Sequence, residues 1–425
     1  MRSIRGNHNL VGVSAYGMEA GINTFQDLDL SLLVSLGDII LPEKRRETNA
    51  DELTGKEEAD TIYDNGQTSG FSLNFEKAQP QHFAFLYAYG LGVVASTAAG
   101  SGYLKTITPM ENDVDEYRSL PSFTAAQRLG KTIAKQRWAS MFIDQVTATF
   151  ARDAWCKVAG TAKGTGKMEN SIVEENISAA KNVTELTLAA NGVDGSTAAA
   201  RLDTIHQIRA ELTPGVWTEV AYTAVSDATP AVITITAPGA ETDVVTYKVL
   251  YAPAEVAWMT FPARLSETPL RVSEITFNLG GSWNGSAFVG GREMGAEINS
   301  LEHSLSNNGA IEFAPGAGGA YASQYFREGR TQNLKLDREF RDYIVQNFMD
   351  TNETFGASIL AEGAEYESGH KYSVEIIFPK LGVLTAPISA NGKRLAEAGD
   401  MAVLEHDTYG SVIVKIKNLQ QTYAA

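Results

Sequence analysis

A short pattern occurs twice in this chain of 425 residues, and it limits the possible folds more than any other feature. Residues 63–73 read YDNGQTSGFSL, and residues 326–336 read FREGRTQNLKL. Each copy has an aromatic residue, then a glycine, a threonine and two apolar residues at the same spacings. The offset is constant, because 326 − 63 = 263 and 336 − 73 = 263. A repeat at constant offset predicts a duplicated structural unit.

Each copy predicts a turn, then a strand, then a helix. Asn65 and Gly66 tolerate left-handed backbone, which predicts a turn at these residues. Apolar and polar residues alternate over 71–75, as in a half-buried strand. A helix is predicted to begin at Pro80, and the second copy leads into helical spacing over 340–348. The positions that define the repeat are Gly66, Thr68, Phe71 and Leu73 in the first copy, and Gly329, Thr331, Leu334 and Leu336 in the second.

Length and composition favour a β-rich globular chain of more than one domain. Apolar residues make up 44% of the chain, charged residues 20%, and glycine occurs 38 times. We predict a mainly β protein in which two sheet-forming units, each with one helix, occupy residues 1–180 and 253–425. Between them, residues 181–252 are predicted to form a small inserted α+β module.

The predicted module contains one helix and about four strands. Ser196 is a suitable cap for a helix that runs to Leu212. Three short strands are then predicted at 219–225, 231–237 and 243–251, separated by proline and glycine turns.

A charged run at 42–60 follows a segment, 27–40, in which alternating leucines predict a long strand. The run is too long for a tight turn, and two interpretations remain open. It is a solvated loop, or it is an arm that becomes ordered against a neighbouring subunit. The candidate subunit-interface residues are Glu43, Lys44, Arg45, Arg46, Glu47, Glu52, Lys56, Glu57 and Glu58.

The overall charge argues against tight binding of nucleic acid. Lys and Arg number 35 against 51 Asp and Glu, which gives a net charge of −16. An acidic surface repels phosphates, although DNA can slide past such a surface without sticking. The single cysteine, Cys156, excludes an intrachain disulfide, and no apolar run is long enough to predict a membrane span.

No motif predicts an enzyme, a cofactor or a metal site. Residues 160–168 resemble a phosphate-binding loop, but the glycine interval holds five residues and Met168 replaces the required Ser or Thr. The six histidines are scattered without metal-ligand spacing. His82 and His206 fall in predicted helices and are expected at the edge of the core. The aromatic residues Trp138, Trp283 and Tyr325 leave open a sugar-binding alternative.

Residues 54–92 and 128–167 resemble the tail tube proteins of long-tailed bacteriophages. They share a charged loop, a strand, the helix entry FEKAQPQH and a closing hairpin. The resemblance implies a β-sandwich or half-barrel with a flanking helix, here duplicated. It also implies a structural virion protein, made in the host bacterial cytoplasm, whose rings stack into a tube through which DNA is ejected. Implied partners are copies of itself, other tail proteins and the double-stranded DNA that passes through.

A ring removes exposed sheet edges by pairing them between subunits. If the usual ring has six single-domain subunits, a doubled chain predicts a trimer. An acidic lumen that repels DNA is a further hypothesis from the net charge. The alternatives are a distal tail or baseplate ring, a carbohydrate-binding adhesin and, least favoured, an enzyme such as a wall hydrolase.

Overall fold

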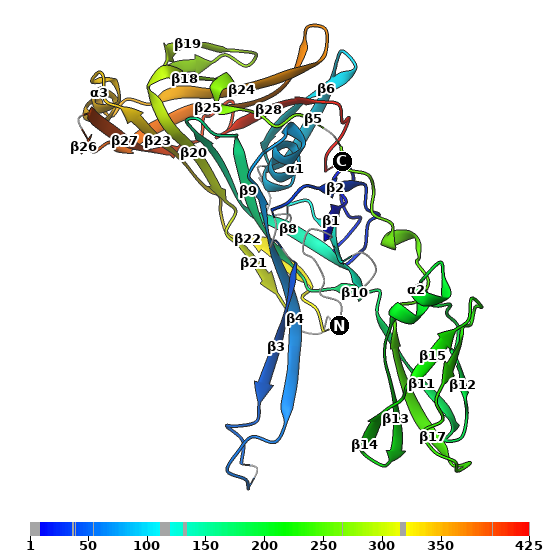
Figure 1. Cartoon of the computed structure of the whole chain (residues 1–425). Coiled ribbons are helices and arrows are strands. Elements are labelled where there is room, and N and C mark those ends of the chain that lie inside the picture. The colour runs from blue at the N-terminus through cyan, green and yellow to red at the C-terminus, as the bar shows by residue number, and fades with distance from the viewer. Residues whose placement is uncertain are drawn as a thin grey trace. The chain divides into compact units, whose positions relative to one another are not determined.

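The computed structural model confirms a mainly β fold with a few helices (Figure 1). The chain divides into two compact units, which are described separately below. The first unit comprises Met1–Val11, Ala126–Arg137 and Met168–Pro262, and the second comprises Gly12–Ala125, Trp138–Lys167 and Ala263–Ala425. The structure describes residues 9–35, 38, 40–53, 55–110, 120–130, 134–265, 267–314, 320–392 and 394–424.

This division differs from the predicted one in three parts. Residues 181–252 lie inside the first unit, which extends beyond them on both sides. Most of the two predicted sheet-forming domains lies together in the second unit, because strands from both pair directly with each other.

The second unit is built on a row of antiparallel strands that contains both copies of the sequence repeat. The order is β3, β4, β9, β8, β20, β23, β27 and β26, and the end of β25 also pairs with β27. The bounds are β3 Leu41–Thr48, β4 Ile62–Phe75, β9 Lys157–Gly164, β8 Ala134–Ala151, β20 Ile298–Ser306, β23 Thr331–Glu339, β27 Arg394–Val403, β26 Ile388–Asn391 and β25 His370–Thr385.

Further strands of the second unit extend from the first part of β25. On one side β25 pairs with β28, then β6 and β5 follow; on the other side come β24, β18 and β19. Their bounds are β28 Ile413–Asn418, β6 Gly102–Pro109, β5 Gly92–Ala99, β24 Phe355–Glu367, β18 Ile275–Trp283 and β19 Phe288–Glu293. Also outside the inserted module are β1 Leu10–Val13, β2 Leu30–Leu32, β7 Phe123–Leu129, β21 Gly309–Glu312, β22 Gln324–Arg327 and the short 3₁₀ turns Val272–Glu274 and Gly295–Glu297.

Helix α1 (Pro80–Leu91) lies against both sets of strands, contacting β28, β6, β25 and β9 (Figure 1). All of its residues are buried, which explains why it is apolar on every side. Pro80 stands in its first turn, where no backbone N–H is required, and Gly92 ends it in the left-handed conformation with φ of 98°. The predicted helix start is therefore confirmed.

Helix α3 (Ile344–Thr351) follows β23 as α1 follows β4, so the predicted order of strand and helix recurs. The helix begins later than predicted, because Tyr343 is its N-cap and is 57% exposed. Phe348 packs on Phe355, with ring centroids 4.1 Å apart.

Two predictions around the first copy are wrong, and one of two open interpretations is narrowed. Over residues 27–40 only Leu30–Leu32 forms a strand, because the Asp29 carboxylate accepts the N–H groups of Ala15 and Tyr16 and holds the chain in a loop. Of the two interpretations of the charged run, a loop throughout is excluded, since Leu41–Thr48 forms β3, and the arm that becomes ordered against a neighbouring subunit stays a prediction. Both faces of this ribbon carry polar residues that water can reach, so no apolar alternation marked it as a strand.

The predicted turn at residues 64–66 is also wrong, because these residues lie within β4. Gly66 nevertheless has a φ of 100°, since it lies where the register of β3 and β4 shifts by one residue. The actual turn lies between Asn49 and Thr61, where the Asn49 side-chain oxygen accepts the N–H groups of Asp60 and Thr61.

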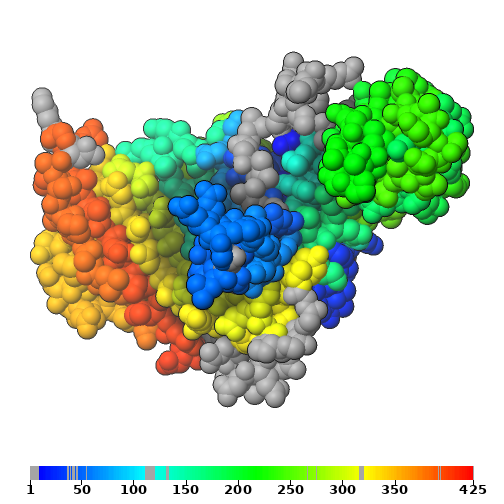
Figure 2. All heavy atoms as spheres, turned by 90° about the horizontal axis from the view of Figure 1, so that it is seen from below, coloured from blue at the N-terminus to red at the C-terminus, as the bar shows by residue number. Residues whose placement is uncertain are grey.

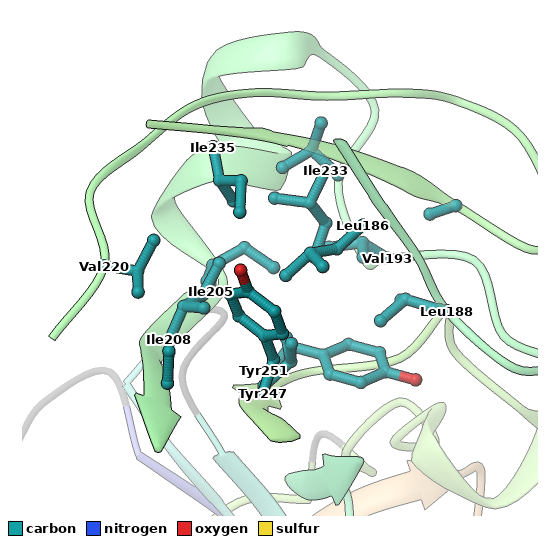
Figure 3. Close-up of a cluster of buried hydrophobic side chains, with 14 residues drawn as sticks. Leu186, Leu188, Val193, Ile205, Ile208, Val220, Ile233, Ile235, Tyr247 and Tyr251 are labelled. Atoms are coloured by element: carbon teal, nitrogen blue, oxygen red, sulfur yellow. The ribbon is translucent and has the colours of Figure 1, made fainter. Parts of the chain in front are cut away.

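In the first unit, the inserted module is a sandwich of two sheets around one apolar core (Figure 3). One sheet has the order β11, β17, β13, β14, and the other has β12, β16, β15. The bounds are β11 Val173–Ala180, β17 Val244–Tyr251, β13 Ile205–Thr213, β14 Val216–Glu219, β12 Glu185–Thr187, β16 Val232–Ile235 and β15 Tyr222–Val225. Strand β10 (Met168–Asn170) and the short 3₁₀ turn Ala257–Met259 also belong to this unit.

The predicted strands of the module are present, but its predicted helix is largely wrong. Helix α2 covers only Ala198–Asp203, and Thr197 caps it. From Ile205 the chain becomes β13, because Ile208 and Ala210 alternate with polar residues and pair with β17. The strand pairing overrides a spacing that also fits a helix.

Candidate assembly surfaces

The two copies of the repeat have the same pairing register as well as the same sequence pattern. In the first copy Glu43 of β3 pairs with Thr68 of β4. In the second copy Ser306 of β20 pairs with Thr331 of β23. The two residues of the second pair follow those of the first at the same offset, since 306 − 43 = 263 and 331 − 68 = 263. The end of β20 (304–306) is therefore the counterpart of residues 41–43 in β3, and β23 is the counterpart of residues 68–75 in β4.

The correspondence extends into two hairpin arms. We call residues 46–64 the first arm and residues 309–327 the second arm. The second arm contains β21 (Gly309–Glu312) and β22 (Gln324–Arg327). Arg46 pairs with Asp64, and Gly309 pairs with Arg327, again at an offset of 263 because 309 − 46 = 263 and 327 − 64 = 263.

The next strand of each copy has a glycine beneath the helix. Leu73 pairs with Gly160 of β9, and Leu336 pairs with Gly399 of β27. A Cβ atom on Gly160 would lie 2.6 Å from a methyl carbon of Leu86 in α1. Strand β27 is thus the counterpart of β9.

A fourth correspondence links β8 with the end of β25. Ile143 pairs with Ala162 of β9, and Val383 pairs with Met401 of β27. In both strands the register shifts directly afterwards, which leaves Asp144 and Leu384 at the same bulge position.

The two copies join within the chain through β8 and β20, where for example Thr147 pairs with Ser304. The second arm then lies on the first copy. The Gly309 N–H donates to Asp144 Oδ1 at 2.7 Å, and the Lys163 ammonium donates to the Gly309 carbonyl at 2.8 Å. We call this contact the internal junction.

Aromatic residues complete the internal junction. Tyr325 of the second arm stacks on Phe142 of β8, with ring centroids 4.0 Å apart and an interplanar angle of 1°. Leu120 and Ile311 belong to the same apolar cluster. Tyr325 is only 4% exposed, so the arm buries its apolar face on the neighbouring copy.

At the two ends of the row, the counterparts of these strands lack such neighbours. Within the described residues, β3 pairs only with β4, and β26 pairs only with β27. The first arm extends away from the other strands of its unit in Figure 1, and Figure 2 views it from its end, beside the second arm (yellow). Large apolar side chains are exposed at both ends: Ile62 (64%) on the arm, and Leu384 (60%), Leu395 (50%) and Ile388 (42%) at the far end.

The face of the row opposite α1 carries short polar side chains and charges of both signs. A groove of about 370 Å³ runs over β8, β20 and β23 on this face. It is lined by Gln145, Thr147, Ser304, Leu305, Ser306, Thr331, Gln332 and Asn333. Exposed or half-buried charges on these strands and on β9 include Lys163, Glu302, Lys335 and Asp337.

The predicted interface residues lie on the first arm and at its base, where the structure describes their side chains. Lys44, Arg46 and Glu47 belong to β3, and Glu52, Lys56, Glu57 and Glu58 belong to the tip. The side chains of Glu43 and Arg45 lie outside the described set. Within the arm Lys56 pairs with Asp60, and the Tyr63 hydroxyl donates to Glu52 at 2.9 Å.

The repeat positions lie in β4 and beside or within β23. Phe71, Leu73, Leu334 and Leu336 are buried in the core, as their alternation predicts. Thr68 is buried whereas Thr331 is exposed, and Gly329 lies between β22 and β23.

The residues considered for binding chemistry do not form one site. Trp138 is buried, Tyr325 belongs to the internal junction, and Trp283 is covered by the Lys415 ammonium 4.3 Å from its ring centroid. His82 is buried in α1, and burial lowers its pKa to about 3, whereas His206 is exposed on β13 and does not lie in a helix.

Within the described ranges, no group of three or more His, Cys, Asp or Glu residues is placed to hold a metal ion. Among the helices that the structure describes, none is long and apolar enough to cross a membrane.

The sequence did not single out Ile62, Leu384 or Ile388. For Ile62 a signal was present, because the offset of 263 residues places it at the position of Tyr325. The two side chains are too different for the sequence alone to show them as a repeat. No protein-family model matches the chain, and no curated protein matches it in sequence.

Proposed function

We propose that this protein is a structural subunit that joins head to tail with copies of itself into closed rings, and that these rings stack into the tail tube of a phage. The observation that carries the proposal is the internal junction, in which β8 of one copy of the repeat pairs with β20 of the other. Such a contact uses two different surfaces. A contact of this kind repeats from molecule to molecule until it closes or extends without end.

Both surfaces are present a second time, at the ends of the row. Residues 41–43 of β3 are the counterparts of 304–306 in β20, and residues 385–387 are the counterparts of 145–147 in β8. Residues 41–43 of one molecule can therefore pair with 385–387 of the next, as 304–306 pair with 145–147 within the chain. This pairing removes two sheet edges that otherwise favour uncontrolled aggregation.

Ring closure follows if each new junction repeats the rotation that relates the two copies within the chain. Every chain then supplies two positions of the ring. A trimer is the proposed assembly, because it gives the six positions that the resemblance to tail tube proteins implies.

The polar face of the row is the proposed wall of the lumen, since α1 contacts the opposite face. Short hydroxyl and amide side chains with charges of both signs offer no continuous basic track to phosphates. The acidic lumen stays a prediction, because the charges named on this face are of both signs. Double-stranded DNA would pass along it without specific binding.

Electron microscopy of the purified protein tests the proposal. Stacked rings with three copies per ring are expected, and mass measurement of isolated rings gives the copy number. Single rings that never stack would instead support the distal tail or baseplate alternative. A protein that stays monomeric at the highest soluble concentration would contradict the proposal.

A further inference from the structure

We infer that the first arm of one molecule docks on residues 382–388 of the next, with Ile62 against Leu384, in the way that the second arm docks on β8 within the chain. This inference rests on the proposed head-to-tail assembly. Beyond that assembly, it identifies the two parts that come into contact, the first arm and residues 382–388.

The arm is a structural copy of one that is already docked. Thr48 pairs with Ile62 in the first arm, and Ile311 pairs with Tyr325 in the second. The offset is 263 in both strands, because 311 − 48 = 263 and 325 − 62 = 263. The position that is 4% exposed in the docked arm, Tyr325, is thus 64% exposed in the free arm, as Ile62.

The receiving surface is also a copy. Phe142 pairs with Lys163, and Gly382 pairs with Ala402, which makes Gly382 the counterpart of Phe142. Asp144, which accepts the Gly309 N–H, has Leu384 as its counterpart. Asp144 is 4% exposed and Leu384 is 60% exposed, so the second surface has the shape of a docking site without its occupant.

The second site carries different side chains from the internal junction, and these are compatible with the same kind of docking. The internal junction stacks Tyr325 on Phe142, whereas the second site offers isoleucine and glycine, which fill less volume. Leu384 in place of Asp144 supplies an additional apolar group. Burial of two aliphatic side chains gains free energy roughly in proportion to the area removed from water.

The chemistry also discourages the wrong pairing. If the first arm docked at β8, Ile62 would lie beside the carboxylate of Asp144, which would lose the Gly309 N–H that it now accepts. The carboxylate would keep the Lys163 ammonium at 3.0 Å, but an aliphatic side chain is a poorer neighbour for it than for Leu384, so each arm prefers its own site.

Chemical cross-linking tests the contact in the full-length protein. Ile62→Cys combined with Leu384→Cys, treated with a short bismaleimide, is expected to give covalent chains or rings of several copies. The native Cys156 is buried and should not react. The matched control combines Ile62→Cys with Val93→Cys, an exposed valine (43%) on β5 of the same unit, and should give no ladder.

A second measurement uses substitutions that cannot disturb the core. Ile62→Asp and Leu384→Asp are each expected to raise the concentration for half-assembly about tenfold or more, whereas Val93→Asp and Ile62→Leu should leave it within about twofold. The double variant should cost less than the sum of the two single effects, because both remove one contact.

The outcomes separate this inference from the proposed function. Rings that form without the Ile62–Leu384 cross-link, and that tolerate both aspartates, would overturn the docking while leaving the ring intact. Absence of any self-association would overturn both.

Discussion

Asp144 and Leu384 occupy the same bulge position in two strands that repeat each other, yet Asp144 is 4% exposed and Leu384 is 60% exposed. The backbone at the two positions is equivalent, so the difference lies in what covers them. The second arm covers Asp144, and the Gly309 N–H donates to its carboxylate at 2.7 Å.

Asp144→Ala should loosen the second arm. It removes the acceptor of the Gly309 N–H and the partner of the Lys163 ammonium at 3.0 Å. A buried donor without an acceptor costs about 1–3 kcal/mol, which urea unfolding can measure. Leu384→Ala is the matched control and should change the stability of the isolated chain by less than about 0.5 kcal/mol. Equal losses for the two variants would contradict this assignment.

The two glycines beneath the helices should respond unequally to alanine. A Cβ atom on Gly160 would lie 2.6 Å from Leu86, so Gly160→Ala should cost about 1–3 kcal/mol through overpacking. A Cβ atom on Gly399 meets its nearest neighbour, the terminal methyl carbon of Met401, at 3.3 Å, and this flexible side chain can move. The thermal unfolding midpoint of Gly160→Ala should therefore be clearly lower than that of Gly399→Ala. The reverse order would argue against the close approach of α1 to β9.

A buried ion pair in the second copy replaces an apolar pair in the first. Phe75 pairs with Val158, and at the corresponding positions Arg338 pairs with Glu397 at 2.5 Å; both of these charged residues are fully buried. Arg338→Phe alone should cost about 3–5 kcal/mol, because it leaves a buried carboxylate without its guanidinium.

Adding Glu397→Val should recover part of that loss, since it restores the apolar pair of the first copy, whereas Glu297 and Asp342, which each pair with Arg338 at 3.2 Å, stay without the guanidinium. Urea unfolding of the two single variants and the double variant gives the coupling energy between the positions. If the two losses of unfolding free energy simply add, the two side chains are not energetically coupled.

Two buried groups should make stability depend on pH. Burial raises the pKa of Glu267 from 4.5 to about 7, and burial lowers the pKa of Lys105 from 10.5 to about 7. Between about pH 4.5 and 7 the folded state holds a proton on Glu267 that the unfolded state has lost, so this group lowers stability as pH rises. Between about pH 7 and 10.5 the unfolded state holds the extra proton on Lys105, so this group raises stability as pH rises.

Glu267→Gln keeps an oxygen for the Gln81 N–H, which Glu267 accepts at 2.8 Å, but it cannot titrate. The unfolding free energy of this variant, relative to the parent protein, should rise by about 3 kcal/mol from pH 4.5 to 7. The difference should stay constant above pH 7. Lys105→Met should remove the increase in unfolding free energy that Lys105 causes above pH 7. Unfolding free energies at pH 5, 7 and 9 check both variants, and parallel pH profiles would count against both pKa shifts.

The sequence predicted those elements whose signal is local. The α1 start at Pro80, the hairpin of β8 and β9 and the alternation of Phe71 with Leu73 all depend on neighbours in the chain. Strand β13 was predicted as a helix, because its pairing with β17 is a distant interaction that overrode a spacing compatible with both structures.

The proposed docking surfaces were only partly predictable for a similar reason. The charged arm was identified as an interface candidate, whereas Ile62 and Leu384 were not. Single exposed apolar residues are common on protein surfaces and carry no signal by themselves. They became informative only when pairing registers showed that Tyr325 and Asp144, at the corresponding positions, are buried.

The internal junction also has a kinetic consequence. Because the polypeptide holds β8 beside β20, this contact forms at any dilution, while the proposed contact between molecules must wait for them to collide. Two copies in one chain thus lower the number of encounters needed to complete the proposed ring. Dilute protein should remain as intact open segments, and a modest rise in concentration should then suffice to close them.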